Sequence, residues 1–147
     1  MTISNDMSFL VGTASGTETV AASAWSPAKQ GRSTVTAAAE ADGVVLVQRV
    51  DDEFDDGSHF AGLNVFTLDP ETAEILCYGF DMYGFPPDPP ARGSWQDGEL
   101  VLERTTPRGS ARIVFGPTAT GYTWRKDFRP DVEHEWQPVA AADLQRT

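Results

Sequence analysis

Short runs in which apolar and polar residues alternate recur about every ten to twelve residues, from roughly Thr17 to Trp136. Segments rich in Gly, Pro and Asp separate the runs, and no long segment with helical periodicity lies between them. Because side chains alternate between the two faces of a strand, each run predicts a short strand with one buried face. The turns are expected at residues 41–43, 55–57, 69–71, 96–98, 107–109 and 117–118.

This regular succession of about nine or ten strands predicts an all-β fold, a single up-and-down antiparallel β-barrel. We expect the sheet to close, because closure removes exposed strand edges. A small closed barrel either fills its interior with side chains or holds one ligand there. The strands are expected at residues 13–22, 33–41, 43–51, 58–68, 74–81, 93–95, 99–105, 111–115, 121–128 and 133–137.

The segments outside these strands have distinct characters. We expect residues 1–7 to form a loose leader and residues 8–147 to form one barrel domain, with a short turn or helical cap at residues 8–12. Four prolines between Pro86 and Pro90 lack the N–H donor that a sheet needs, which predicts a stiff loop at one rim. Residues 139–144 fit either a strand end or a frayed helical turn.

The composition is that of an ordinary globular domain, with 40% apolar and 22% charged residues in a chain of 147. The single cysteine, Cys77, excludes an internal disulfide and fits a reducing compartment. The sequence shows neither a signal-like start nor an apolar run long enough to cross a membrane. We therefore expect a cytoplasmic protein.

The net charge of −11 changes the expected partners. Binding to nucleic acid depends mainly on Lys and Arg, and the 22 acidic residues outnumber the 11 basic ones by two to one, so we expect no nucleic-acid partner. The same negative charge disfavours contact with anionic membrane surfaces. The expected partner is a small hydrophobic ligand or substrate, with no nucleic acid and no membrane. A homodimer stays open.

Three segments carry a resemblance to a known family. Residues 9–18 (FLVGTASGTE), residues 25–27 (WSP) and residues 97–109 (DGELVLERTTPRG) resemble the bacterial family called domain of unknown function 1579. The resemblance covers roughly residues 8–137. It implies a calycin-like barrel, related in shape to lipocalins, fatty-acid-binding proteins and nitrobindins, and it implies no established activity.

The sequence departs from that family's pattern at both ends of the barrel. Gly12-Thr13-Ala14 stands where the family has a Gly-x-Trp opening, and residues 140–142 (AAA) replace an aromatic close. Either these changes open a barrel end, or Trp25 and Trp136 fill the space. We favour the second interpretation, because protein interiors rarely leave voids.

The two histidines, His59 and His134, are the candidates for a bound metal or haem. The resemblance to nitrobindin-type barrels makes either one a candidate haem ligand, but both lie in acidic surroundings that favour solvated side chains. Zinc-ligand spacing is absent. The acidic run at residues 51–57 lacks the ligand spacing of a calcium loop and predicts a solvated hairpin turn. We predict no cofactor and no metal.

Aromatic and basic residues are the candidates for contact with a ligand. The aromatic ones would either line a cavity or fill the core. An inward-pointing arginine would need Glu103, Asp81 or a ligand carboxylate as its partner, whereas an outward one would form a weak cross-strand ion pair. The predicted ligand-binding set is Tyr78, Phe80, Tyr83, Phe85, Trp95, Arg104, Arg112 and Trp124.

Two functions remain. The sequence has no Gly-x-Ser-x-Gly motif and no glycine-rich phosphate loop, and Cys77 lies in an apolar strand, which favours a non-catalytic barrel that binds a small apolar or amphipathic ligand. The alternative is a cofactor-independent isomerase or cyclase that acts on a hydrophobic intermediate, so enzymatic activity stays open. Its candidate acid and base residues are Asp81, Glu103, Tyr78 and Tyr122.

Overall fold

The computed structural model describes residue 3 and residues 5–147, and its main elements are one short 3₁₀ helix and ten strands. The helix is η1 (Asn5–Leu10). The strands are β1 (Gly12–Val20), β2 (Lys29–Glu40), β3 (Val45–Phe54), β4 (His59–Leu68), β5 (Ile75–Asp81), β6 (Ala91–Gln96), β7 (Glu99–Thr106), β8 (Gly109–Pro117), β9 (Gly121–Arg129) and β10 (Gln137–Arg146).

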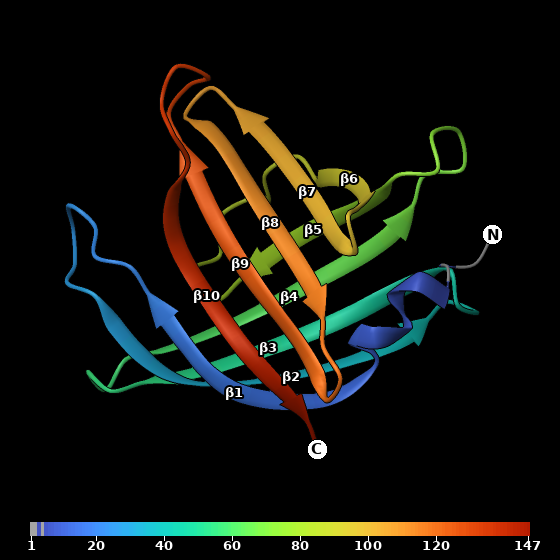
Figure 1. Cartoon of the computed structure of the whole chain (residues 1–147), viewed down its shortest axis with the longest axis horizontal. Helices are drawn as coiled ribbons and strands as arrows, with labels where there is room; N and C mark the ends of the chain where they lie inside the picture. Colours follow the sequence, from blue (N-terminus) through green and yellow to red (C-terminus); the bar gives the residue numbers. More distant parts are fainter. Residues whose placement is uncertain (1–2, 4) are drawn as a thin grey trace.

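Each strand pairs antiparallel with its neighbours in sequence, and β1 pairs with β10 to close the sheet (Figure 1). The predicted single up-and-down β-barrel of about nine or ten strands is thereby confirmed. The bends that closure requires leave little room at some positions. At Gly31 in β2, a Cβ atom would lie 2.1 Å from the carbonyl oxygen of Glu53, and at Gly16 in β1 it would lie 1.9 Å from that of Asp143.

The last strand is the main difference from the predicted elements. A strand was expected at residues 133–137, but β10 begins at Gln137, and residues 130–136 connect it to β9. The ambiguous segment at residues 139–144 lies within β10, where Ala142 and Leu144 are buried and Asp143 is exposed. Alanine is a weak hydrophobic signal, so the alternation in this segment is faint in the sequence although the strand closes the barrel.

The hydrophobic core fills the end of the barrel that η1 covers. Met7 and Leu10 are 1% and 2% exposed, and the Phe9 ring packs edge-on against Trp95 and Tyr122, with centroid distances of 5.6 and 5.7 Å. Residues 1, 2 and 4 of the expected leader lie outside the described residues, while residues 5–7 belong to η1.

The two tryptophans that were expected to fill the barrel end lie elsewhere, so this expectation was wrong. Trp25 is 94% exposed in the connection between β1 and β2. The Trp136 ring lies under the guanidinium groups of Arg112 and Arg129, at 4.5 and 4.3 Å from the ring centroid. The side chains of η1, which sequence patterning had marked only as a turn or cap, fill the end instead.

The ladder between β5 and β6 is short. It runs only from the pair Ile75 and Gly93 to the pair Cys77 and Ala91, and residues 82–90 then pass as an irregular loop from β5 to β6. Asp88 attaches this loop to the barrel wall, because its carboxylate accepts a hydrogen bond of 3.0 Å from Arg108 and lies 3.7 Å from Arg104. The proline-rich loop is therefore irregular, as predicted.

Candidate ligand-binding cavity

A cavity of about 380 Å³ occupies the part of the barrel away from η1. Lys29, Ser58, His59 and Tyr83 lie around its mouth, at the start of β2 and β4 and in the loop after β5. The walls are mostly apolar, and they include side chains from opposite sides of the barrel. The apolar lining residues are Val20, Val35, Val50, Phe54, Phe60, Cys77, Ile113, Phe115, Trp124, Val139 and Ala140.

The alanines of β10 help to leave this space open. Across the inner wall, Glu18 of β1 lies opposite Ala142, which lies opposite Trp124 of β9. One step nearer the mouth, Ala140 lies between Val20 and Lys126 in the same way. Because an alanine side chain is a single methyl group, the wall is recessed between the larger residues. Ala140 therefore lines the cavity, and Ala142 lies next to it on the same face of β10.

Two buried carboxyl groups face the cavity from β1 and β3. Glu18 is 4% exposed and Asp52 is 3% exposed, and the wholly buried Ser33 lies opposite Asp52 in the ladder between β2 and β3. The atoms Glu18 Oε1, Asp52 Oδ1 and Ser33 Oγ are buried without a hydrogen-bond partner. Unpartnered buried polar atoms are costly, so this cluster is unusual for a purely structural core.

The protonation of Glu18 follows from these surroundings. Burial, the negative charge of Asp52 and a hydrogen bond shared with Asp52 together raise the pKa of Glu18 to about 8, while Lys29 opposes the shift. A carboxyl group of this kind keeps its proton at neutral pH and can give or accept it within the cavity.

A basic group lies on another part of the wall. Lys126 of β9 points inward, and burial, followed by the positive charge of Arg104, lowers its pKa. Arg104 also lies on the inner face of β7, but its ionic partner is Asp88, not Glu103 or Asp81. The cavity therefore has an acidic pole at Glu18 and Asp52 and a basic pole at Lys126.

A chain of hydrogen bonds lies between the cavity and the packed core. Asn64 donates from Nδ2 to Gln48 Oε1 at 2.8 Å, and Gln48 donates from Nε2 to the Tyr122 hydroxyl at 3.3 Å. Burial raises the pKa of Tyr122 to about 12, so its hydroxyl stays protonated near neutral pH. Gln48 and Asn64 give the floor of the cavity a neutral polar character.

The predicted ligand-binding residues are distributed over several regions. Tyr83 and Trp124 line the cavity, and the Tyr83 ring lies 6.2 Å from that of Phe60. Trp95 packs against Phe9 at the closed end. Arg112 pairs with Asp127 at 2.9 Å on the outer face, opposite to the inward Ile113. Arg104, described above, and three aromatic residues also lie outside the cavity lining: Tyr78 is half-buried, Phe80 is 45% exposed and Phe85 is 80% exposed.

The candidate acid and base residues are also dispersed. Tyr122 is buried inside the barrel. Glu103 is exposed on β7, on the face opposite to the buried Leu102. Asp81 is exposed at the end of β5, where its Oδ1 atom accepts a hydrogen bond from the backbone N–H of Tyr83. The structure does not bring these groups together.

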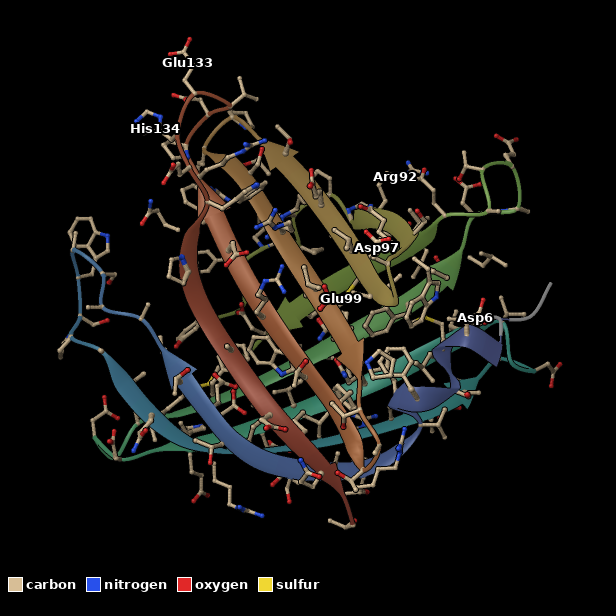
Figure 2. All side chains as sticks on the ribbon, in the orientation of Figure 1. Asp6, Arg92, Asp97, Glu99, Glu133 and His134 are labelled. Atoms are coloured by element: carbon tan, nitrogen blue, oxygen red, sulfur yellow. The ribbon has the colours of Figure 1, made fainter. Side chains whose placement is uncertain are left out.

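The histidines are separated as well. His59 is exposed at the mouth of the cavity. His134 lies in the connection between β9 and β10 (Figure 2). Its Nδ1 atom lies 2.7 Å from Asp131 Oδ1. In residue 3 and residues 5–147, no group of three or more His, Cys, Asp or Glu side chains is arranged to hold a metal ion. The acidic run at residues 51–57 forms a turn only at its end, and Asp52 belongs to β3 with its side chain inside the barrel.

Sequence patterning missed Glu18, Ser33 and Asp52. A signal existed for Asp52, because Leu46, Gln48, Val50, Asp52 and Phe54 occupy alternate positions and therefore share the inner face of β3. Because Asp51, Asp52 and Glu53 are all acidic, the alternation of inward and outward positions was not visible there, and the run was predicted to be a turn.

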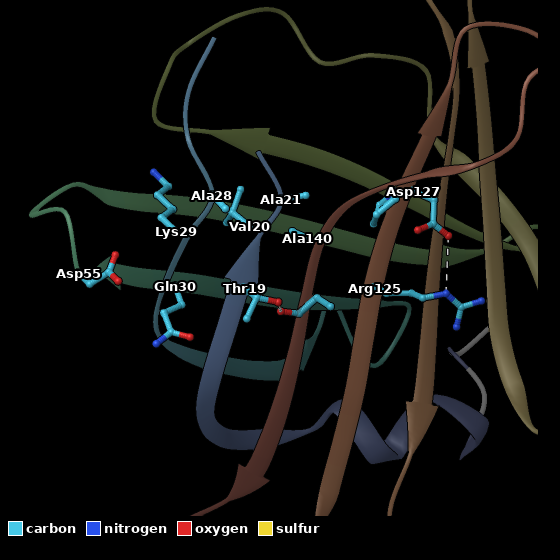
Figure 3. Close-up of a pocket in the computed structure, with 12 residues that line it drawn as sticks. Thr19, Val20, Ala21, Ala28, Lys29, Gln30, Asp55, Arg125, Asp127 and Ala140 are labelled. Atoms are coloured by element: carbon cyan, nitrogen blue, oxygen red, sulfur yellow. Dashed lines mark hydrogen bonds and ion pairs between the residues drawn. The ribbon is translucent and has the colours of Figure 1, made fainter. Parts of the chain in front are cut away.

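A second hollow of about 560 Å³ lies outside the barrel along the ends of β1 and β10 (Figure 3). Arg125 and Asp127 in its lining already have partners, since Arg125 Nε lies 3.6 Å from Asp127 Oδ2, and Asp127 also pairs with Arg112. The inner cavity is the more enclosed of the two and keeps buried polar atoms that have no hydrogen-bond partner. We therefore take the inner cavity as the candidate site.

The fold and the cavity define a class of protein, a closed calycin-like barrel with an internal space. One solved structure of this fold is the crystal structure of Rv2717c from M. tuberculosis, which matches with a TM-score of 0.72 and 13% identity over 99% of each chain. No family model matches this chain, so the resemblance to domain of unknown function 1579 gains no support beyond the barrel architecture. No curated protein matches either. Within the described part of the chain, no helix is long and apolar enough to cross a membrane.

Proposed function

We propose that this protein binds a small, largely apolar molecule inside the barrel. The observation that supports this most directly is the cavity of about 380 Å³, which opens at one end and combines apolar walls with a few polar groups. Natural small-molecule sites have this size and composition, and barrel mouths are a usual place for them. The likeness in fold to a solved structure does not establish an activity, so the proposal rests on the cavity.

The first test asks whether the cavity accepts a neutral molecule. Indole is a suitable probe because it is small, aromatic and uncharged. We expect wild-type protein to bind indole, and Ala140→Phe to weaken binding about tenfold or more by placing a ring in the cavity. Ala141→Phe is the matched control, because Ala141 is the exposed neighbour on the other face of β10. Calorimetric titration of the three proteins measures the difference.

Failure of wild-type protein to bind indole, or equal binding by Ala140→Phe and wild type, would contradict the proposal. Native mass spectrometry of freshly purified protein adds an independent measurement, because a retained mass gives the size of a natural ligand. An absorbance spectrum of the same sample tests the expectation that no haem is bound, and a Soret band would contradict that expectation.

The second candidate is the cofactor-independent isomerase or cyclase, and the pair of Glu18 and Asp52 is the observation that favours it. A carboxylic acid that keeps its proton beside a second buried carboxyl group places two groups that can take part in proton transfer in one cavity. These residues replace the dispersed set of Asp81, Glu103 and Tyr78 as the candidates for proton transfer. If a molecule retained by the protein is returned chemically unchanged after prolonged incubation, the binding function is favoured over catalysis.

A further inference from the structure

The cluster of Glu18, Asp52 and Ser33 leaves buried polar atoms at the cavity wall without a hydrogen-bond partner. Glu18 and Asp52 flank β2 from β1 and β3, so their carboxyl groups converge on the same part of the cavity wall. Glu18 Oε1, Asp52 Oδ1 and Ser33 Oγ are all buried, and none has a hydrogen-bond partner. A ligand that brings hydrogen-bond donors would satisfy these atoms, and an ammonium group carries three N–H donors and a compensating charge.

From this arrangement we infer that the cavity selects a protonated amine on an apolar body, with the ammonium group bound between Glu18 and Asp52. This inference rests on the proposed binding function and adds the chemical class of the ligand. A metal ion fits the same place less well, because the described residues place no third His, Cys, Asp or Glu side chain with the pair.

The charges around the pair support this orientation. Asp52 from β3 is the acidic group that acts on Glu18, and Lys29 from β2 is the basic group that acts on it. The other titratable groups that line the cavity are Lys126 from β9, His59 from β4, Cys77 from β5 and Tyr83 from the following loop. Because the half-buried Lys126 belongs to another row of the wall, a ligand ammonium is favoured only at the acidic pole.

The apolar body has aromatic neighbours close to the same pole. Phe60 of β4 lies opposite Asp52 in the ladder, and Trp124 lies two strands from Glu18 with only Ala142 between them. Aromatic faces attract a nearby cation as well as apolar groups. An arylalkylamine therefore matches the pole and its surroundings.

Binding of a cation also has a consequence for the proton on Glu18. Near neutral pH Glu18 keeps its proton, since its pKa is raised to about 8. An ammonium ion bound beside Glu18 stabilises the ionised form of that carboxyl group, so the proton leaves Glu18 for the solvent as the complex forms. Affinity should rise with pH up to about 8, as long as the amine itself stays protonated.

Three compounds of similar shape test the inference: 2-phenylethylamine, 2-phenylethanol and 3-phenylpropionate, each titrated calorimetrically at pH 7. We expect the amine to bind about tenfold or more tightly than the alcohol, and the anion to bind most weakly. Glu18→Gln and Asp52→Asn should each reduce the ratio of amine affinity to alcohol affinity to within about threefold. Asp51→Asn and Glu53→Gln are matched controls, because both residues flank Asp52 on the exposed face of β3.

The outcomes separate this inference from the binding function. If the alcohol or the anion binds as tightly as the amine, the inference is overturned while the cavity remains a binding site. If none of the three compounds binds, both proposals fail. A further titration of wild-type protein in buffers of different ionisation enthalpy needs no variant, and the absence of proton release on amine binding would also overturn the inference.

Discussion

A carboxyl group that is 4% exposed, as Glu18 is, destabilises the folded state whenever it is ionised. Its neighbours increase this cost, because Asp52 is acidic and the bases Lys29 and Lys126 lie at the mouth and on another row of the wall. We therefore expect an apolar residue at position 18 to give a more stable folded state than Glu18 does. A role in binding a ligand inside the cavity accounts for Glu18 better than a role in packing does.

The stability of the protein should reflect this residue through pH. The pKa of Glu18 is 4.5 in the unfolded chain and about 8 in the folded protein, so in this window the unfolded state binds fewer protons and stability falls as pH rises. Glu18→Gln should remove this contribution and raise the melting temperature above that of wild type by about 3 °C or more at pH 8.5. Thermal melts between pH 4.5 and 8.5 measure the effect.

The control for this experiment is Glu103→Gln, which changes an exposed carboxylate on the outer face of β7. Its melting temperature should follow that of wild type at each pH, apart from a constant offset. A Glu18→Gln profile that also parallels wild type would show that Glu18 ionises normally in the folded protein.

At the scale of single elements, β2 shows how backbone spacing limits the sequence. Gly31→Ala would place a Cβ atom 2.1 Å from the carbonyl oxygen of Glu53, and because that atom belongs to the backbone, the two strands must separate. We expect a loss of roughly 1–3 kcal/mol or more in the free energy of unfolding, measured by urea denaturation. Gly79→Ala is the matched control in β5, since its Cβ would make only an ordinary contact of 3.5 Å with Asn64 Oδ1. Equal losses in the two variants would refute this explanation.

The elements differ in how clearly the sequence predicts them. β7 contains Leu100, Leu102 and Val101 beside a clear Asp-Gly turn, and its predicted start at Glu99 is confirmed. The sequence left most of β10 ambiguous because alanines carry its inner face. The end of β3 was missed because Asp52 is a charged residue at a position where the alternation calls for an apolar one. The candidate site depends on these same two segments, so patterning of hydrophobic and polar residues predicted the barrel but not the chemistry of its cavity.

For the whole molecule, the two ends of the barrel have different roles. η1 fills one end with Met7 and Leu10, while the other end leads to the cavity. Leu10→Ala should lower the free energy of unfolding by about 2–5 kcal/mol, because it leaves a space in the packed end. Val11→Ala, at a neighbouring residue that is 45% exposed, should change it by only about 0.5 kcal/mol. Chemical denaturation of both variants measures these values, and a loss below about 1 kcal/mol for Leu10→Ala would mean that η1 does not seal the barrel.

The pairing of β1 with β10 has a topological consequence. Around the wall, the order of the strands is the same as their order along the chain, and Ala14 lies opposite Arg146 where the circle closes. The barrel is therefore a closed series of hairpins, and the strand order does not require the chain termini to lie between β1 and β10. A circular permutant could begin at β6, after the exposed loop at residues 82–90, and join β10 to β1 through η1. Such a chain would specify the same barrel, with η1 as an internal segment.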